Sequence, residues 1–332
     1  MKYILTFFYC IIVAQVFGQI KSPEDFGFRH FEYMFNGDKV DILVKSKKGE
    51  EGIKKPIFFF CQGSLPQPLI KFDEHGTYGV FPFNTDSLSN KFHIVIVSKP
   101  YIPIISNVND LGENFSYQDS LGQFPKSYSE RNLPEYYVSR NLKIIKYLQK
   151  KDWVSKKQLV VAGHSEGSTI ALLMTYKSRL ITHLIYSAGN PFGRMMSIIQ
   201  QSREFETDTD SISYGEKQIK FWQEVVENKN NMDASKGDPY KTTFDFSKSL
   251  ITNFEKINIP SLVCYGTKDW SAPFNDFLRV DMIRKGKNNY TFQAYIGTEH
   301  NYFPLTSDNK PNHDVYNWDK VVNDWLKWLE KN

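Results

Sequence analysis

A serine between two glycines is the residue in this sequence whose type and setting most clearly suit chemistry. Ser165 lies at the centre of residues 163–167, whose sequence is Gly-His-Ser-Glu-Gly. In a tight turn of this type the serine is held in a strained backbone conformation that lifts its hydroxyl clear of the chain, and glycine leaves room on both sides. The backbone N–H of Glu166 then begins a helix and can donate to an oxyanion on a substrate. Ser165 is therefore the candidate nucleophile.

The residues around this turn decide how much weight the motif carries. Roughly one chain in ten of this composition would contain it by chance, and an ordinary glycine-rich turn between a strand and a helix is the alternative. Residues 158–162 are typical of a buried strand, and residues 168–174 are apolar around the helix that they predict. Strand, turn and buried helix form the context in which this motif denotes a nucleophile.

A catalytic serine needs a base that takes its proton and an acid that holds the base in the right tautomer. His300 ends a predicted strand late in the chain, and Asp269 ends the strand predicted before it. Because the carboxyl ends of parallel strands meet along one edge of a sheet, we expect both side chains to emerge beside Ser165. The order Ser, Asp, His along the chain is that of a known catalytic triad.

Other residues of suitable types are rivals for these roles. His313 lies in a predicted polar loop and His183 opens a predicted strand, and an isolated Asp or His at a strand end usually serves a turn or the surface. Glu299 is the rival acid, but neighbours on an extended segment point to opposite sides, so it should rarely meet the ring of His300. Joint placement after the serine favours Asp269 and His300.

The elements that must position these residues alternate between strand and helix, which predicts a mainly parallel sheet with right-handed crossovers. A hairpin is predicted over residues 26–46, and residues 65–90 predict an irregular loop. Residues 105–132 lack clear periodicity and predict either a functional loop or a partly helical segment. The other expected strands cover residues 56–61, 92–98, 158–162, 181–187, 259–265 and 290–296, and the expected helices cover residues 133–150, 168–174, 275–285 and 315–329.

Residues 191–256 interrupt this alternation. Their apolar spacing predicts two helices, separated by polar and glycine-containing breaks. An ordinary pair of helices on the sheet is one interpretation, and a cap over the serine is the other. In the second case Phe192, Met195 and Trp222 are candidate walls of the substrate pocket.

With these residues in place, the chain resembles the α/β-hydrolase superfamily from the opening hairpin to the C-terminal helix. The residues that carry the resemblance are 163–167, Gly-Thr-Lys-Asp at 266–269 and Gly-Thr-Glu-His at 297–300. The resemblance implies the α/β-hydrolase fold, with a mainly parallel central sheet, helices on both faces and a helical cap insertion. It also implies hydrolysis of an ester, amide or thioester through an acyl-serine. Gln-Gly-Ser at 62–64 stands where many members carry His-Gly, which implies the N–H of Ser64 as a second oxyanion donor.

Two other function classes remain open. A serine peptidase of the prolyl-oligopeptidase type shares this catalytic domain, although such enzymes usually add a large propeller for which the chain has no room. A hydrolase fold kept as a binding protein without catalysis would lack a member of the triad, and none is missing here.

Composition limits the partners. The chain has 332 residues, 41% of them hydrophobic, and a net charge of +4 without a basic run, so nothing indicates a nucleic acid. There is no metal-ligand spacing, phosphate-cradling loop or dinucleotide fingerprint, so we expect no metal and no cofactor. The expected partner is a small-molecule acyl substrate, and the oligomeric state stays open.

Residues 1–18 stand apart from the rest. Lys2 gives a positive start, an apolar stretch follows, and Gly18 provides a small-residue exit. This pattern is typical of a cleaved signal peptide, with an uncleaved membrane anchor as the alternative. The sequence therefore predicts export to the periplasm or the medium, no stable membrane span after cleavage, and one domain over residues 19–332. Cys61 and Cys264 should be unpaired, because the superfamily does not place their strands side by side.

Overall fold

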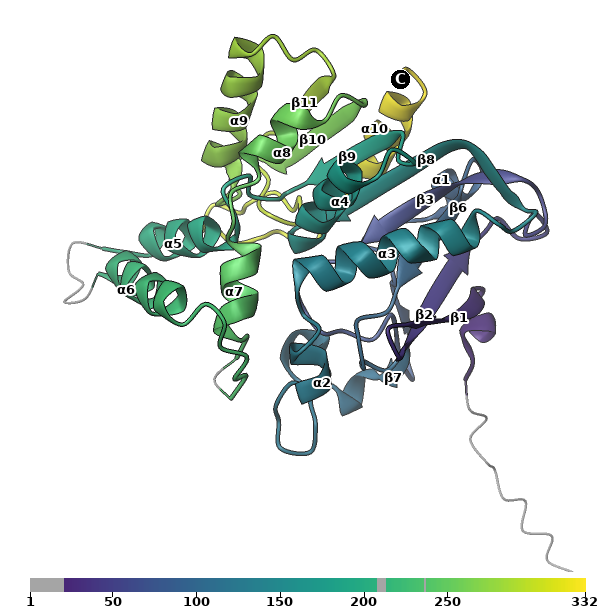
Figure 1. The fold of residues 1–332 in the computed structure, drawn as a ribbon, viewed down its shortest axis with the longest axis horizontal. Coiled ribbons are helices and arrows are strands. Elements are labelled where there is room, and N and C mark those ends of the chain that lie inside the picture. The colour runs from purple at the N-terminus through teal and green to yellow at the C-terminus, as the bar shows by residue number, and fades with distance from the viewer. Residues whose placement is uncertain (1–20, 208–212, 236) are drawn as a thin grey trace, which may run out of the picture.

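An eight-stranded sheet runs through the molecule, and helices cover both of its faces (Figure 1). The structure is a computed structural model that describes residues 21–207, 213–235 and 237–332. The expected signal peptide lies outside these residues. Within the described ranges no helix has the length and apolar character needed to cross a bilayer.

All eight strands were expected, and the predicted hairpin supplies the first two. The strand order is β1-β2-β6-β3-β8-β9-β10-β11. β1 and β2 are antiparallel to their neighbours, and the remaining pairs are parallel. The strands are β1 (Arg29–Phe35), β2 (Asp38–Lys45), β3 (Lys55–Cys61), β6 (His93–Val97), β8 (Val154–His164), β9 (His183–Ser187), β10 (Ser261–Gly266) and β11 (Tyr290–Tyr295).

Alternate residues of each central strand face two separate cores. On β3, Ile57 and Phe59 pack in one core, and Phe58 and Phe60 pack in the other. Successive side chains of a strand point to opposite faces, so an unbroken apolar run is what a strand covered on both faces requires. The first core lies under α3 (Pro134–Leu148), α4 (Glu166–Lys177), α8 (Ile251–Lys256) and α9 (Ala272–Arg284), and the second under α1 (Asp86–Ser89) and α10 (Trp318–Leu329).

Residues 65–90, expected to be a loop, and residues 105–132, expected to be a loop or partly helical, contain a small second sheet. β4 (Ile70–Asp73) pairs antiparallel with β5 (Gly76–Tyr78) and parallel with β7 (Ile105–Asn107). Strands of three or four residues are too short to show an alternating pattern, so they could not be predicted from the sequence. The rest of these segments holds the 3-10 turns η2 (Val108–Asp110) and η3 (Glu113–Phe115) and the short helix α2 (Lys126–Ser129), and a further 3-10 turn, η1 (Pro23–Phe26), precedes β1.

Residues 191–256 divide between a projecting part and the core. α5 (Arg194–Glu204), α6 (Tyr214–Glu227) and α7 (Tyr240–Phe246) pack on one another and project from the sheet on the side of α4's N-terminus (Figure 1). α8 instead packs against α4, with Phe254 fully buried in the core beneath the sheet. Only α5 to α7 therefore have the placement expected of a cap.

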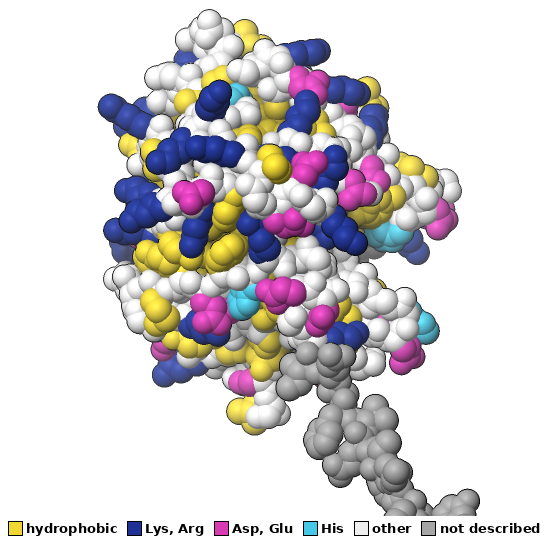
Figure 2. All heavy atoms as spheres, turned by 90° about the vertical axis from the view of Figure 1, so that its right-hand side faces the viewer, with side chains coloured by type: hydrophobic (Ala, Val, Ile, Leu, Met, Phe, Trp, Pro, Cys, Tyr) yellow, Lys and Arg dark blue, Asp and Glu magenta, His cyan; other side chains and the backbone are white. Residues whose placement is uncertain are grey.

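The two cysteines are free, as expected. Cys61 ends β3 and Cys264 lies in β10, and two strands, β8 and β9, separate them in the sheet. Strands that are not adjacent lie too far apart for a disulfide. On the face seen in Figure 2, lysine and arginine side chains are interspersed with acidic and apolar ones.

Candidate active site

Ser165 occupies the turn between β8 and α4 with a backbone conformation rare for any residue but glycine, at φ 57° and ψ −128°. Its N–H donates to the carbonyl oxygen of Ser187 on β9 at 2.9 Å. The flanking glycines are required sterically. A Cβ on Gly163 would lie 2.0 Å from the carbonyl oxygen of Gly167, and a Cβ on Gly167 would lie 2.1 Å from that of Cys61. The sequence motif thus forms the tight, strained turn that it predicts.

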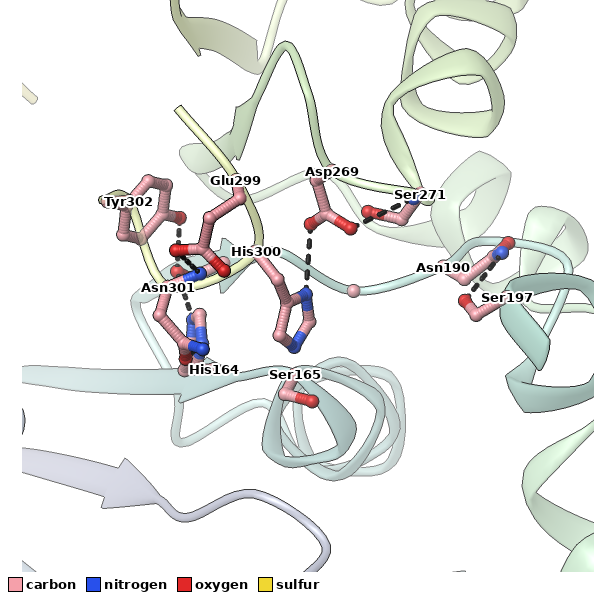
Figure 3. A network of polar contacts seen from close by, with 12 residues as sticks. His164, Ser165, Asn190, Ser197, Asp269, Ser271, Glu299, His300, Asn301 and Tyr302 are labelled. Carbon is pink, nitrogen blue, oxygen red and sulfur yellow. Dashed lines mark hydrogen bonds and ion pairs between the residues drawn. The ribbon is translucent and has the colours of Figure 1, made fainter. Parts of the chain in front are cut away.

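The structure brings His300 and Asp269 together above this turn (Figure 3). Nδ1 of His300 lies 3.0 Å from Oδ2 of Asp269, whose side chain is almost completely buried. The N–H of Ser271 donates to the other carboxylate oxygen at 3.0 Å. A carboxylate bonded to Nδ1 fixes the tautomer that leaves Nε2 free to accept a proton.

The ring of His300 lies between Asp269 and Ser165. Figure 3 shows its free nitrogen above the Ser165 side chain, while the serine hydroxyl is turned to one side. No hydrogen bond joins these two side chains in the described structure. Rotation about the Cα–Cβ bond of Ser165 would swing the hydroxyl toward the ring, and such bonds are often loose in the absence of substrate.

The two partners shift each other's pKa in opposite directions. Burial alone would raise the pKa of Asp269, but the charge of His300 and hydrogen bonds from His300 and Ser271 hold it below the usual range. Burial alone would lower the pKa of His300, but the charge and hydrogen bond of Asp269 raise it above 6.5. These are the directions expected of an ionised acid that supports a basic imidazole.

The two expected oxyanion donors lie on either side of the serine. Glu166 is the first residue of α4, and the first N–H groups of a helix have no acceptor within it. Residues 62–64 pass directly beside the turn, because a Cβ on Gly63 would lie 3.7 Å from Cβ of Ser165. The Gln62 side chain donates to the carbonyl oxygen of Val97 at 2.7 Å, which holds this segment to the end of β6.

A cavity of about 350 Å³ opens at Ser165 and His300. Helix α5 gives it one face through residues 194, 197, 198 and 201, which follow the helical repeat. The remaining lining residues include Ser64, Glu166, Thr169, Ala188, Asn190, Asp238, Phe246, Asp269 and Trp270.

The three residues expected to form the pocket wall lie elsewhere. Met195 is buried on the opposite side of α5, and Phe192 packs on the rings of Phe274 and Phe277. Trp222 stacks on Phe244 between α6 and α7. None of the three lines this cavity, because the prediction selected apolar residues, whereas the residues of α5 that meet the cavity are mainly polar.

The rival residues do not approach the serine. His183 starts β9 at the opposite end of the strand from Ser187, and its Nδ1 bonds the Thr182 hydroxyl at 2.8 Å. His313 packs on the ring of Phe303. Each is therefore placed for a structural role.

The rival acid, Glu299, faces its own loop. One of its carboxylate oxygens accepts the N–H groups of Asn301 and Phe303, at 2.8 and 3.0 Å. The residue therefore shapes the turn that carries His300 and leaves Nδ1 of that ring to Asp269.

Sequence analysis missed a buried chain of hydrogen bonds behind the histidine. The hydroxyl of Tyr302 lies 2.5 Å from Oγ of Ser187, which lies 3.1 Å from Nδ1 of His164. Nε2 of His164 lies 3.2 Å from Oδ1 of Asn301, the neighbour of His300. Burial, with the charge of His300 in second place, lowers the pKa of His164 to about 3, so it stays neutral. These hydrogen bonds hold the loop that carries His300 to β8 and β9. The only indication of them in the sequence was His164, which lies within the Gly-His-Ser-Glu-Gly motif.

A buried ion-pair network next to the serine was also missed. Nη2 of Arg194 bonds Oε2 of Glu166, and Nη1 lies 2.5 Å from Oδ2 of Asp238. The amide of Asn132 donates to the other oxygen of Asp238 at 3.1 Å. These residues are too far apart in sequence for any pattern to connect them.

One group of side chains outside the site has metal-binding types. His30, Glu32 and Asp41 have ligand atoms within 4.8 Å of one another on the β1–β2 edge. However, His30 already bonds Asp41 at 2.8 Å and Lys39 forms an ion pair with Glu32. β6 and β3 separate this edge from the strand that carries Ser165.

Comparison with known proteins agrees with this geometry. Residues 126–331, well over half of the chain and including all three triad positions, match the Prolyl oligopeptidase family, Peptidase_S9. A comparison with curated proteins gives no match.

Solved structures share the fold at low identity. An acylaminoacyl peptidase from Pyrococcus horikoshii has a TM-score of 0.50 and 15% identity, and the match covers 82% of this chain but 37% of that one. Est1E from Butyrivibrio proteoclasticus, solved with ferulic acid, has a TM-score of 0.54 and 15% identity, covering 89% of this chain and 97% of that one. The chain thus spans little more than a third of the peptidase and nearly all of the esterase. It is a hydrolase with the α/β-hydrolase fold and belongs to the prolyl oligopeptidase family of serine hydrolases.

Proposed function

We propose that the protein hydrolyses an ester or related acyl bond through an acyl-serine intermediate, with Ser165, His300 and Asp269 as its triad. The observation that carries the proposal is the 3.0 Å contact between His300 and Asp269 directly above the strained turn of Ser165, at the mouth of a cavity. A serine in this setting has both its base and the group that orients the base.

In the acylation half, Oγ of Ser165 attacks the substrate carbonyl carbon and Nε2 of His300 takes the hydroxyl proton. The tetrahedral oxyanion accepts hydrogen bonds from the N–H groups of Glu166 and Ser64. The bond to the leaving group then breaks, and His300 returns the proton to the departing oxygen or nitrogen. Asp269 stabilises the imidazolium throughout and does not take up its proton.

Water completes the reaction in the second half. His300 takes a proton from the water, whose oxygen attacks the acyl carbon. Collapse of the second tetrahedral intermediate releases the carboxylic acid, and Oγ of Ser165 recovers its proton from His300. Every proton is returned, so no redox partner or cofactor enters the cycle.

Covalent labelling tests the proposal. A fluorophosphonate probe should label Ser165, and both Ser165→Ala and His300→Ala should remove labelling and nearly all hydrolysis of p-nitrophenyl acyl esters. The double variant should be little worse than either single variant, because residues that act as a unit are not additive. Labelling at another residue, or none in the folded protein, would refute the proposal and favour a silent binding protein.

A peptidase activity is the second candidate, and family membership favours it. Amide cleavage uses the same triad but needs stronger protonation of the leaving nitrogen. A comparison of p-nitrophenyl esters with alanine and proline nitroanilides separates the two. Higher kcat/KM for the anilides would assign a peptidase, and cleavage of the esters alone would assign an esterase.

Two further expectations belong to this proposal. Helices α5 to α7 act as a cap that selects a small-molecule acyl substrate, since α5 and α7 line the cavity. Residues 1–18 direct export and are then removed, so mass spectrometry of the mature protein should find an N-terminus near Gln19. An intact Met1 in soluble cytoplasmic material would contradict export.

A further inference from the structure

A negatively charged side chain stands where the proposed reaction develops negative charge. Glu166 is the first residue of α4, and in the proposed reaction its backbone N–H donates to the oxyanion. The side chain of the same residue carries a carboxylate. That side chain is only 8% exposed. A buried anion close to a developing anion raises the energy of the transition state, because screening by water is weak there. The carboxylate of Glu166 therefore counteracts the stabilisation that the N–H of Glu166 gives to the oxyanion, unless a cation neutralises that carboxylate.

Arg194 is the cation in contact with it. Its guanidinium forms an ion pair with Glu166 and comes from the first residue of α5, in the projecting part of the chain. Asp238, which precedes α7, holds the other side of the guanidinium at 2.5 Å, and the ring of Phe246 lies 4.8 Å from its central carbon. Asp238 in the loop before α7 and Phe246 of α7 thus hold Arg194 against Glu166.

The other basic side chains near Glu166 compensate it less. Lys99 forms no ion pair with Glu166 among the described residues, and burial lowers the pKa of Lys99 to about 8. The guanidinium of Arg140 is bonded to the carbonyl oxygen of Ser98 and the side chain of Asn141. One oxygen of Glu166, Oε1, is buried without a hydrogen-bond partner. Neutralisation of Glu166 therefore depends mainly on Arg194.

We propose that Arg194 is a positioning residue for the hydrolytic reaction. It cancels the charge of Glu166 and fixes that residue, so that the Glu166 N–H can stabilise the oxyanion. The inference rests on the proposed function, because it needs an oxyanion at this place. Through Arg194, the projecting helices α5 to α7 would contribute to stabilisation of the transition state as well as to substrate choice.

A double-mutant cycle tests this role with a short p-nitrophenyl ester. Arg194→Met removes the charge and should lower kcat by about ten- to a hundredfold, the range for a like charge near a developing anion, with a smaller change in KM. The double variant E166Q/R194M should recover most of this loss, because the carboxylate of the residue whose N–H faces the oxyanion is then gone. Arg194→Lys keeps the charge and should lose less than R194M.

A matched control lies on the same helix. Arg203 of α5 pairs with Glu206 and Glu216 and does not line the cavity. Arg203→Met also removes a guanidinium from the projecting helices, and it should leave kcat within about twofold. Thermal unfolding of every variant separates loss of fold from loss of rate.

An anionic inhibitor gives a readout that a purely structural role would not move. A boronic acid that bonds to Oγ of Ser165 forms a tetrahedral anion, so R194M should weaken its binding by about the factor lost from kcat. A neutral alcohol or amide product analogue should bind R194M nearly as well as it binds the wild type. An equal loss for both ligands would overturn the proposal.

Two outcomes distinguish failure of this inference from failure of the proposed function. If the wild-type protein is not labelled at Ser165 by a fluorophosphonate, the proposed function fails and Arg194 has no oxyanion to serve. If Ser165 is labelled but Arg194→Met costs as much in the Glu166→Gln background as alone, Arg194 does not act through Glu166 and the inference fails. If the R194M single variant does not fold, the comparison of E166Q with E166Q/R194M still tests the inference, because neither variant buries an unpaired Glu166. Arg194→Met should cost little kcat in that background, and a loss of about tenfold or more there would overturn the inference.

Discussion

Nδ1 of His300 lies 3.0 Å from Oδ2 of Asp269, although 31 positions separate the two residues. The strands before them, β10 and β11, are parallel neighbours paired in register up to Gly266 and Tyr295. The loops that follow start at the same edge and touch, since a Cβ on Gly266 would lie 2.3 Å from the carbonyl oxygen of Thr298. The parallel pairing of β10 and β11 therefore places Asp269 and His300 next to each other.

The first prediction concerns the acid. Asp269→Asn keeps the shape of the side chain but favours the wrong tautomer of His300, and kcat should fall by about 10³- to 10⁴-fold. Glu299→Gln is the control, because a glutamine oxygen can still accept the two N–H groups that Glu299 binds, so most activity should remain. Steady-state kinetics on one p-nitrophenyl ester compares them. A harmless Asp269→Asn, or an equally damaging Glu299→Gln, would show that the acid is misassigned.

The second prediction concerns pH. His300 must be neutral to accept the serine proton, and Asp269, acting against the effect of burial, raises its pKa above 6.5. A raised pKa keeps the ring protonated to higher pH, so kcat/KM should fall as the pH drops through a midpoint above 6.5. His164 stays neutral across this range, because burial lowers its pKa to about 3. The profile of kcat/KM should therefore show one histidine limb, and a midpoint below 6.5 would contradict the role of Asp269.

The sequence predicted that Ser165, Asp269 and His300 lie together, because each of them follows a strand that the residue pattern indicates. Buried parallel strands are continuous apolar runs, and Ser165 and Asp269 follow two of them, β8 and β10. His300 follows β11, an edge strand in which half-buried and exposed residues alternate. The hairpin and the main helices were predictable for the same reason, because periodicity records burial. The small sheet formed by β4, β5 and β7 was not, since its strands are short and pair across loops.

The residues that line the cavity were not predicted, because they depend on which side of α5 faces the cavity. Residues 194, 197, 198 and 201 of α5 face the cavity and are mainly polar, whereas Met195 faces the interior. Apolar periodicity indicates the buried face of a helix, whereas the residues of α5 that line this cavity are mainly polar. Nothing local connects Arg194 to Glu166, because only the tertiary fold brings them together.

The third prediction concerns the turn of the nucleophile. Gly167→Ala places a Cβ 2.1 Å from the backbone carbonyl oxygen of Cys61, so β3 and α4 must separate. We expect a loss of at least about 2 kcal/mol in the free energy of unfolding, together with loss of fluorophosphonate labelling. Gly52→Ala is the control, because a Cβ at Gly52 meets nothing within 4 Å. Equal stability of the two variants would contradict the packing described here.

The fourth prediction concerns the thiols. Burial raises the pKa of Cys61 to about 12, and burial also raises the pKa of Cys264, whose sulfur accepts a hydrogen bond from the Trp325 indole at 3.3 Å. A thiol reagent should therefore react with neither residue in the native protein. After unfolding without a reductant, mature protein that lacks residues 1–18 should show two free thiols. A count of zero would mean a disulfide, which the strand order forbids.

The last prediction concerns the cavity and compares Ile198, which lines it, with Trp222, which does not. Ile198 of α5 lines the cavity, so Ile198→Ala should enlarge it and raise kcat/KM for longer acyl chains relative to acetyl by about tenfold. Trp222→Ala removes a larger side chain from the same projecting region, but that side chain stacks on Phe244 outside the cavity. It should lower the temperature of unfolding and leave the ratio of long- to short-chain rates unchanged. A series of p-nitrophenyl esters from acetate to octanoate measures both ratios. If Trp222→Ala shifts the preference and Ile198→Ala does not, the acyl group binds beneath α6, and the cavity at Ser165 receives the leaving group instead.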